Sequence, residues 1–218
     1  LLKAGFFERK TTQQYFELSN SGEGRFLPDR YVEGTCPHCN YESARGDQCD
    51  DCGKTLDSKE LINPRSKLNP DAKIEFRETE HLFFKLSEFR DVLLDWLSEG
   101  KEHWRSSVIN FTRNWLKEGL IDRAVTRDLD WGIEIPREGY ENKRMYVWFE
   151  AVMGYYSASV HWAKNQGKPE EWKKWWENED SEHYYFMAKD NIPFHTIIWP
   201  AMLSGCGYKL PYDVPANE

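Results

Sequence analysis

The chain has 218 residues, of which 39% are hydrophobic, enough to form a core in one large domain or in two. Charged residues make up 30%, and the formal net charge of −8 at pH 7 argues against a surface that binds nucleic acid over its whole extent. No apolar run reaches 18 residues, so the sequence predicts no transmembrane helix and no membrane partner. Free thiols without a leader sequence predict a cytoplasmic protein.

Residues 20–80 are rich in turn-forming residues and contain four of the five cysteines. These four lie in CPHCNYESARGDQCDDC (36–52) as two Cys-x-x-Cys pairs, a spacing at which four thiolates can enclose a tetrahedral cation. Zinc suits such a sulfur set best, and a closed four-sulfur shell leaves no position for a substrate, so the predicted metal is structural. The predicted ligands are Cys36, Cys39, Cys49 and Cys52.

Other interpretations of the four cysteines stay open. Two disulfides could form in loops this short in a secreted protein, but Cys206 would lack a partner and the sequence shows no signal peptide. Iron–sulfur ligation is a further alternative. Asn40 and Gly53 each follow the second cysteine of a pair, and both residue types tolerate the left-handed backbone that ends such a turn.

The middle of the chain predicts a short strand and then two helices. HLFFKL (81–86) is the strand, Ser87 is expected to cap the first helix, and Gly100 and Gly119 end the two helices. Apolar residues recur on one face of each helix, which predicts the packing faces of a helical hairpin. The two stripes are Phe89, Val92, Leu93, Trp96 and Leu97, then Trp104, Val108, Phe111 and Trp115.

Strand and helix patterns alternate in the last third of the chain. RMYVWF (144–149) alternates like a strand and runs into a helix, EAVMGYYSASVHWAK (150–164). PEEWKKWWENED (169–180) predicts a short, aromatic-rich surface helix that forms an insert. YYFMA (184–188) predicts a strand that runs directly into a helix, KDNIPFHTIIWPAML (189–203). This order predicts a parallel sheet with crossover helices, in which ligands bind where strands end and helices begin.

Two strand–helix junctions carry aromatic and polar side chains. Trp148 and Ala151 lie at the first junction, and Tyr155 lies one helical turn further on. At the second junction His195 and Trp199 are four residues apart and share one helix face. Together these residues could line a pocket for a small, mostly apolar ligand.

Each of these residues also has an ordinary structural interpretation, which spacing alone favours. Tryptophan and tyrosine near helix starts are usually core residues, and a single histidine on a helix face usually packs. Asp190 could accept hydrogen bonds from ribose hydroxyls or could only cap its helix. Arg127 and Asp128 could be an ordinary surface pair.

Six collinear blocks, spanning residues 25–203, resemble the methionyl-tRNA synthetases, a family of class I aminoacyl-tRNA synthetases. Six blocks in order are far more specific than any one motif. The blocks are RFLPDRYVEGTCPHC, GDQCDDCG, ELINPRS, TRDLDWGIEIP, YVWFEAVMGYYSAS and KDNIPFHTIIWPAML.

The resemblance implies an α/β fold: part of a Rossmann-like parallel-sheet catalytic domain with an inserted α+β connective-peptide domain. Residues 1–144 would form the connective-peptide domain, with its zinc knuckle at about 25–70, and residues 145–218 would begin the second half of the catalytic domain. The HIGH and KMSKS signatures that handle ATP are absent, so we expect an excised fragment that is inactive alone. The resemblance also implies that the zinc stabilises a lobe that lies over the active site, where the tRNA acceptor end binds.

The resemblance also implies an activity and the residues that serve it. Methionine and ATP, with Mg²⁺, give methionyl-adenylate, and the acyl group then passes to the acceptor end of tRNA(Met). Asp190 matches a residue near the adenylate ribose, and Arg127 matches an arginine near the active centre, a catalytic position. The residues that match the methionine pocket are Trp148, Ala151, Tyr155, His195 and Trp199.

Some family members carry a second pair of cysteine knuckles, but the matching stretch YFELSNSGEGRFLPDR (15–30) has no cysteine, so one zinc is predicted. The main alternative function is a zinc-ribbon nucleic-acid-binding module, which would need a basic face around the cysteines. Arg45 and Arg65 lie there, but four aspartates disfavour this alternative. A structural zinc domain and a class I synthetase for another apolar amino acid are further alternatives. The aspartates are Asp47, Asp50, Asp51 and Asp57.

Overall fold

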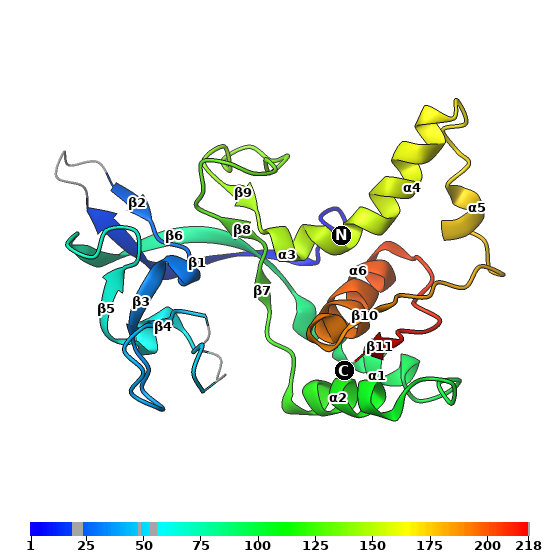
Figure 1. The fold of residues 1–218 in the computed structure, drawn as a ribbon. Coiled ribbons are helices and arrows are strands. Elements are labelled where there is room, and N and C mark those ends of the chain that lie inside the picture. Colours follow the sequence, from blue (N-terminus) through cyan, green and yellow to red (C-terminus); the bar gives the residue numbers. More distant parts are fainter. Residues whose placement is uncertain (19–23, 48, 53–55, 218) are drawn as a thin grey trace. The chain divides into compact units, whose positions relative to one another are not determined.

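The computed structural model describes residues 1–18, 24–47, 49–52 and 56–217. The chain divides into two compact units, each assembled from separate segments, and Figure 1 labels their elements. The chain passes from unit 2 to unit 1 after Met145, near the predicted boundary, and it also crosses between the units after Glu8, His81 and Val125. Unit 1 consists of Leu1–Glu8, Leu82–Val125 and Tyr146–Glu218, and unit 2 of Arg9–His81 and Thr126–Met145.

Strands dominate the first half of the chain. Two long strands, β1 and β6, are neighbours in a sheet of order β2-β1-β6-β7 (Figure 1), and a smaller antiparallel sheet has the order β4-β3-β5. The predicted strand at 81–86 overlaps the end of β6, which is longer than its apolar part because polar residues occupy most of its exposed positions. The bounds are β1 Phe7–Leu18, β2 Gly24–Phe26, β3 Val32–Thr35, β4 Ala44–Arg45, β5 Ile62–Ser66, β6 Ile74–Phe84 and β7 Arg123–Ala124, with 3-10 turns η1 Asp29–Tyr31 and η2 Ser58–Glu60.

The small sheet β4-β3-β5, with the four cysteines beside it, is called the cysteine lobe below (residues 32–66). Its core is small and includes two of the thiols, since Cys36 and Cys49 are 0% and 1% exposed. So few apolar residues bury little area, and lobes of this size usually need a crosslink or a metal. The buried cluster is Tyr15, Leu27, Val32, Cys36, Ala44, Cys49, Leu56 and Leu61.

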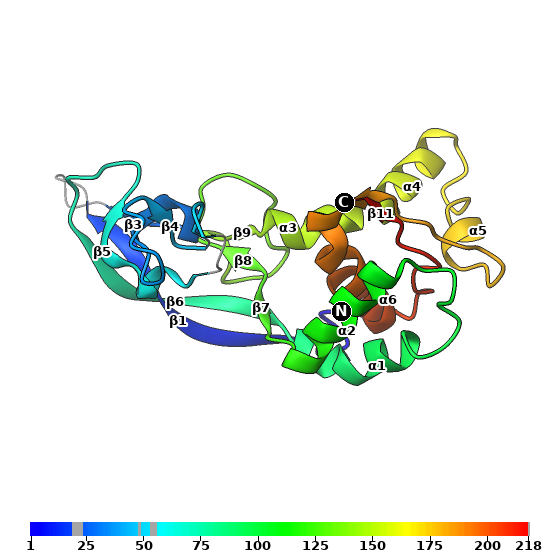
Figure 2. The same cartoon turned by 60° about the horizontal axis from the view of Figure 1, so that its bottom comes forward.

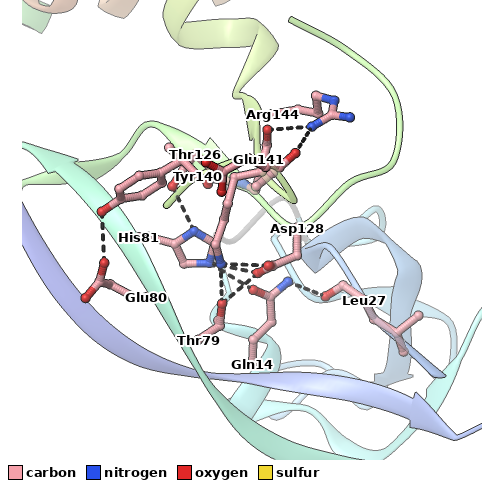
Figure 3. Close-up of polar contacts among 12 residues, drawn as sticks. Gln14, Leu27, Thr79, Glu80, His81, Thr126, Asp128, Tyr140, Glu141 and Arg144 are labelled. Atoms are coloured by element: carbon pink, nitrogen blue, oxygen red, sulfur yellow. Dashed lines mark hydrogen bonds and ion pairs between the residues drawn. The ribbon is translucent and has the colours of Figure 1, made fainter. Parts of the chain in front are cut away.

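A buried polar network in unit 2 links β6 to the antiparallel pair β8 (Thr126–Arg127) and β9 (Arg144–Met145), and Figure 3 shows it. His81, 3% exposed, lies at its centre. Its Nδ1 is 2.9 Å from Thr126 Oγ1, and its Nε2 is 3.3 Å from Gln14 Oε1 and from Asp128 Oδ2. Asp128 is also paired with Lys143, at 2.6 Å between Oδ1 and Nζ. Because its charges are paired, the network can be buried at moderate cost.

Because of this network, we expect the free energy of unfolding to depend on pH through His81. Burial, with the nearby charge of Lys143, lowers the pKa of His81 from 6.5 to about 4 despite the opposing charge of Asp128. Between these values the unfolded state binds more protons, so the free energy of unfolding falls as the pH decreases from 6.5 towards 4. His81→Gln should remove this component, on the order of 2–3 kcal/mol across the window. Denaturant titrations at several pH values measure it.

The matched control for this prediction is His161→Gln. His161 is exposed on α4 (Gly154–Asn165) and should leave the pH dependence of unfolding unchanged. Equal pH slopes in the His81 variant and the wild type would contradict the assignment.

Unit 1 is mainly helical, and α1 (Arg90–Trp96) and α2 (Ser106–Glu118) contact each other as the predicted hairpin. Leu93 and Val108 are buried, at 0% and 1% exposure, as the stripes predict, and the fully buried Leu116 was not among the predicted residues. Val92 and Phe111 are 44% and 42% exposed, so the predicted stripes are wider than the true packing faces.

Ser87 does not cap α1 as predicted. It lies inside a 3-10 turn, Leu86–Phe89 (η3), and its hydroxyl donates to Asp122 Oδ1 at 2.7 Å. Just before this turn, the Lys85 N–H donates to the Phe6 carbonyl at 3.0 Å, which holds Lys85 against the N-terminal segment. The 3-10 turn therefore delays the α-helix to Arg90.

The strand predicted at 144–149 is wrong in its second half. Only Arg144–Met145 is extended, and α3 (Val147–Glu150) begins after Tyr146, whose N–H donates to the Val125 carbonyl at 2.8 Å. In this short helix Phe149 is buried, whereas Trp148 is 51% exposed. The apolar residues that suggested a strand therefore do not share one buried face, because Phe149 alone is buried in this helical turn.

The second predicted junction is present, although its strand is short. β10 (Met187–Ala188) pairs in parallel with β11 (Ala216–Asn217), and Tyr184 makes a parallel bridge with Asp213. The chain then turns directly into helix, as predicted. No helix in the described part of the chain is long and apolar enough to cross a membrane. The remaining elements are η4 Ala151–Met153, α4 Gly154–Asn165, α5 Lys173–Trp176, η5 Lys189–Asn191, the π-helix η6 Phe194–Ile198 and α6 Trp199–Cys206.

Candidate functional site

Three of the predicted pocket residues in unit 1 form one cluster. The Tyr155 hydroxyl, from α4, is 2.8 Å from His195 Nε2, from η6. The ring centroids of Tyr155 and Trp199 are 6.5 Å apart. His195 and Trp199 are 6% and 3% exposed, whereas Tyr155 is 45% exposed. The cluster therefore has two buried members and one that reaches the surface of the unit.

The backbone that carries His195 and Trp199 is a π-helical turn, in which the Trp199 N–H donates to the Phe194 carbonyl, five residues back. Pro200 gives a physical reason for this turn. In an α-helix Pro200 would face the Thr196 carbonyl without an N–H to donate, and its ring would clash there. A wider turn relieves that clash, and single π-turns inside helices occur often at functional sites.

The hydrogen bonds of His195 determine which of its ring nitrogens carries the proton. Its Nδ1 lies 2.9 Å from the Asn191 carbonyl, which only accepts, so Nδ1 carries the hydrogen. Burial lowers the pKa of His195, against a smaller opposite effect of that carbonyl, so the ring is neutral near pH 7. Nε2 then accepts from the Tyr155 hydroxyl. The cluster therefore presents aromatic surface and paired dipoles without net charge, which suits an apolar or thioether ligand.

Sequence analysis missed a fourth aromatic residue of this cluster. Tyr185 is buried, and its ring centroid lies 5.0 Å from that of Tyr155 and 5.7 Å from that of His195. Burial raises the pKa of Tyr185 to about 12, so its hydroxyl stays neutral. The residue lies in the predicted strand YYFMA, and a strand leading into a ligand-binding junction was the signal that could have identified it.

Two predicted pocket residues lie outside the cluster. The Trp148 ring packs against Phe194, with centroids 5.7 Å apart, and half of its surface is exposed. Ala151 begins η4, one turn before Tyr155, and its side chain is exposed. Trp148 therefore approaches the helix that carries His195 but does not belong to the buried group.

Asp190, predicted to bind the nucleotide, and Arg127, predicted to be catalytic, are in different units. Asp190 lies in η5, is exposed and caps no helix with its side chain; its Oδ1 accepts from Asn191 Nδ2 at 3.3 Å. The alternative role of Asp190 as a helix cap is therefore wrong. Arg127 lies in β8 in unit 2, where its Nη1 donates to the Thr126 carbonyl at 2.8 Å.

The four predicted metal ligands form one cluster in unit 2. Their sulfur atoms all lie within 4.8 Å of one another, with Cys36–Cys52 at 3.9 Å and Cys39–Cys49 at 3.6 Å. A tetrahedral ion with metal–sulfur bonds of about 2.3 Å requires sulfur–sulfur distances of about 3.8 Å. The donor set therefore fits a tetrahedral metal ion.

The electrostatics of the cysteines also call for a cation. Burial raises the pKa of Cys36, but hydrogen bonds from the His38 N–H and from neighbouring groups outweigh it and lower the pKa to about 7. The Tyr41 N–H lowers the pKa of Cys39, but burial and the neighbouring thiols raise it to about 12. Thiols this close cannot all ionise unless a positive ion compensates their charges.

The disulfide alternative does not fit this geometry. The sulfur separations of 3.6 and 3.9 Å are well beyond the S–S bond length of about 2.0 Å, and all five cysteines are free thiols. Asn40 has φ 62°, the left-handed conformation predicted for the end of the first knuckle, and Gly53 lies outside the described residues.

Comparison with solved structures defines the class of fold. The chain resembles the methionyl-tRNA synthetase of Mycobacterium tuberculosis in complex with methionyl-adenylate, with a TM-score of 0.61 and 19% identity, over 99% of this chain and 35% of that one. The ligand-free form of the same enzyme gives a TM-score of 0.61 and 20% identity. The fold is therefore the α/β fold of a class I tRNA synthetase, as predicted.

Similarity in sequence identifies the family to which the chain belongs. Residues 1–218 match the family described as tRNA synthetases class I (M), and the chain belongs to that family. A methionine–tRNA ligase of Dehalococcoides mccartyi is 65% identical over 195 residues, covering 89% of this chain and 35% of the relative. One of Thermomicrobium roseum is 56% identical over 95% of this chain and 35% of the relative. The chain thus spans little more than a third of the length of these curated relatives.

Proposed function

We propose that the chain is part of a methionine–tRNA ligase that activates methionine with ATP to methionyl-adenylate and transfers it to tRNA(Met). The observation that carries this proposal is the uncharged aromatic cluster of Tyr155, His195 and Trp199 in a chain of this family. A role in protein synthesis would place the ligase in the cytoplasm.

The cluster would select methionine by shape and polarity. Tyr155, Trp199 and the buried Tyr185 offer ring surfaces, which favour contact with a thioether sulfur. The neutral His195, held by Asn191, keeps the Tyr155 hydroxyl in place without adding a charge. We assign Trp148 and Ala151 to the same binding site, where the exposed Trp148 ring would cover bound methionine.

We assign nucleotide binding to Asp190 and a catalytic role to Arg127. The exposed Asp190 carboxylate, at the start of the segment that leads into η6, would accept hydrogen bonds from the adenylate ribose. Arg127 would help to shape the active centre as a positive charge, and Mg²⁺ would accompany ATP as substrate. Catalysis would then rest on the positioning of the methionine carboxylate against the α-phosphate and on compensation of developing charge.

We propose that the four cysteines hold one structural zinc ion. Four sulfurs with no open position supply fixed geometry rather than chemistry. The zinc would crosslink and stabilise the cysteine lobe, whose core is too small to be stable alone. We retain the proposal that residues 1–144 form the connective-peptide domain and residues 145–218 the start of the second half of the catalytic domain.

The alternative of a zinc-ribbon nucleic-acid-binding module is not favoured. Two arginines near the cysteines are neutralised by acidic partners: Arg30 pairs with Asp47 at 2.6 Å and Arg45 with Asp50 at 3.1 Å. Phosphate binding relies on cations that are available to release counterions. Arginines that are already paired with carboxylates offer little of this.

Amino-acid-dependent ATP–pyrophosphate exchange tests the proposed function. The full-length ligase that carries this chain would be assayed with methionine, leucine, isoleucine and valine. We expect exchange with methionine and at least about 100-fold less with the others, because their side chains differ in length and branching from the one the pocket fits. Exchange with another of these amino acids would overturn the assignment of the pocket.

A further inference from the structure

The short helix α5 (Lys173–Trp176), predicted as a surface insert, buries one of its two tryptophans. Helix α5 lies beside α4 in both views (Figures 1 and 2), and Trp176 is only 6% exposed. Its ring packs edge-on against Trp199, with centroids 5.9 Å apart and planes at 78°. The insert therefore reaches the aromatic cluster through a single side chain.

Trp199 depends on packing for its orientation. Its indole Nε1 interacts weakly with the Tyr185 hydroxyl but makes no hydrogen bond of normal geometry in the described chain. Its ring has Tyr155 as one aromatic neighbour, at 6.5 Å, and Trp176 as another, at 5.9 Å. Aromatic side chains without a fixed hydrogen bond are held by their neighbours in a close-packed interior.

Trp176 is itself firmly held. Its ring contacts Tyr156 on α4 at 5.3 Å and His183 at 4.6 Å. His183 Nε2 donates to the Trp175 carbonyl at 2.9 Å, and Lys209 Nζ donates to the Ser181 carbonyl at 2.8 Å. The first bond ties the segment after α5 back to that helix, and the second ties the same segment to the chain that follows α6. Trp176 is thus a fixed support rather than a side chain that happens to lie nearby.

We propose that Trp176 is a positioning residue: it fixes the Trp199 ring and so sets how strictly the pocket measures the length of an amino-acid side chain. The inference rests on the proposed function. An apolar pocket discriminates between substrates by only about 1–3 kcal/mol per methylene. This discrimination is lost if the side chains that line the pocket move to accommodate a longer substrate. A pocket wall supported by Trp176 would resist such movement.

The test compares Trp176→Leu with Trp175→Leu in the full-length ligase. Trp175 is the adjacent residue of α5, is 43% exposed, and packs on Trp162 instead, at 5.2 Å. Pyrophosphate exchange would be measured with methionine and with ethionine, which is one methylene longer. For Trp176→Leu we expect the methionine KM to rise about threefold to tenfold, with kcat and the ATP KM nearly unchanged.

Specificity is the decisive readout. A purely structural loss lowers the amount of active enzyme, but it does not change the ratio of the kcat/KM values for two substrates. The methionine-to-ethionine ratio of kcat/KM should fall by a similar factor in Trp176→Leu and should be largely restored in Trp176→Phe, which keeps a ring. Trp175→Leu should match the wild type. A ratio in Trp176→Leu and Trp176→Phe equal to that of Trp175→Leu would overturn the inference. Absence of methionine-dependent exchange in the wild type would instead overturn the proposed function.

Discussion

Replacement of Cys36 and Cys49 with serine should abolish zinc binding and unfold the cysteine lobe. Both thiols are buried, and both belong to the buried apolar cluster of that lobe. Metal binding in such lobes supplies an apparent free energy of about 10–16 kcal/mol, more than a small core can replace. Metal analysis should show one zinc per wild-type chain and none per variant, and hydrogen exchange should show loss of protection in β3 and β5.

Cys206→Ser is the control for this prediction. Cys206 is exposed at the end of α6, in unit 1, and its replacement should leave both the zinc content and the protection of β3 and β5 unchanged. Protected amides in a metal-free lobe of the double variant would contradict the view that a metal holds this lobe together.

Trp199→Ala should weaken methionine activation more than any other single change in the pocket. Trp199 is 3% exposed and contacts the rings of Tyr155 and Trp176, so its removal leaves a cavity where the pocket wall was. We expect kcat/KM for methionine to fall about 100-fold, mostly through KM, because the lost contact serves substrate binding rather than the reacting atoms. Pyrophosphate exchange measures both parameters.

A buried tryptophan elsewhere in unit 1 separates this effect from general destabilisation. Trp104 is 5% exposed and its indole donates to the Tyr212 carbonyl at 2.7 Å, so Trp104→Ala, like Trp199→Ala, should lower the free energy of unfolding by about 3–5 kcal/mol. It should leave the methionine KM close to that of the wild type. An unchanged methionine KM in Trp199→Ala would remove Trp199 from the binding site.

The parts that sequence predicted best depend on short-range geometry. Two Cys-x-x-Cys pairs bend their own sulfurs towards one point, so the cluster follows from spacing within 17 residues, and the structure brings these sulfurs within 4.8 Å. His195 and Trp199 are four apart on one helical segment, and both rings contact that of Tyr155. The Asn40 conformation was predictable for the same reason.

The parts that sequence missed depend on long-range packing or on rival periodicities. Tyr185 and Trp176 reach the cluster through ring contacts with residues that are distant in the chain, and no local pattern encodes such contacts. The strand predicted at 144–149 failed because a four-residue helix is too short to reveal its period. The π-turn could have been suspected from Pro200, since a proline inside a helical pattern disturbs the turn before it.

The most direct test of the central claim locates the bound side chain. Crystals of the full-length ligase, grown without selenium, would be soaked with selenomethionine and measured at the selenium absorption edge. The proposal predicts one strong anomalous peak among Tyr155, His195 and Trp199, because selenium takes the place of the thioether sulfur. A peak elsewhere, with none at this cluster, would contradict the claim that these residues form the methionine pocket.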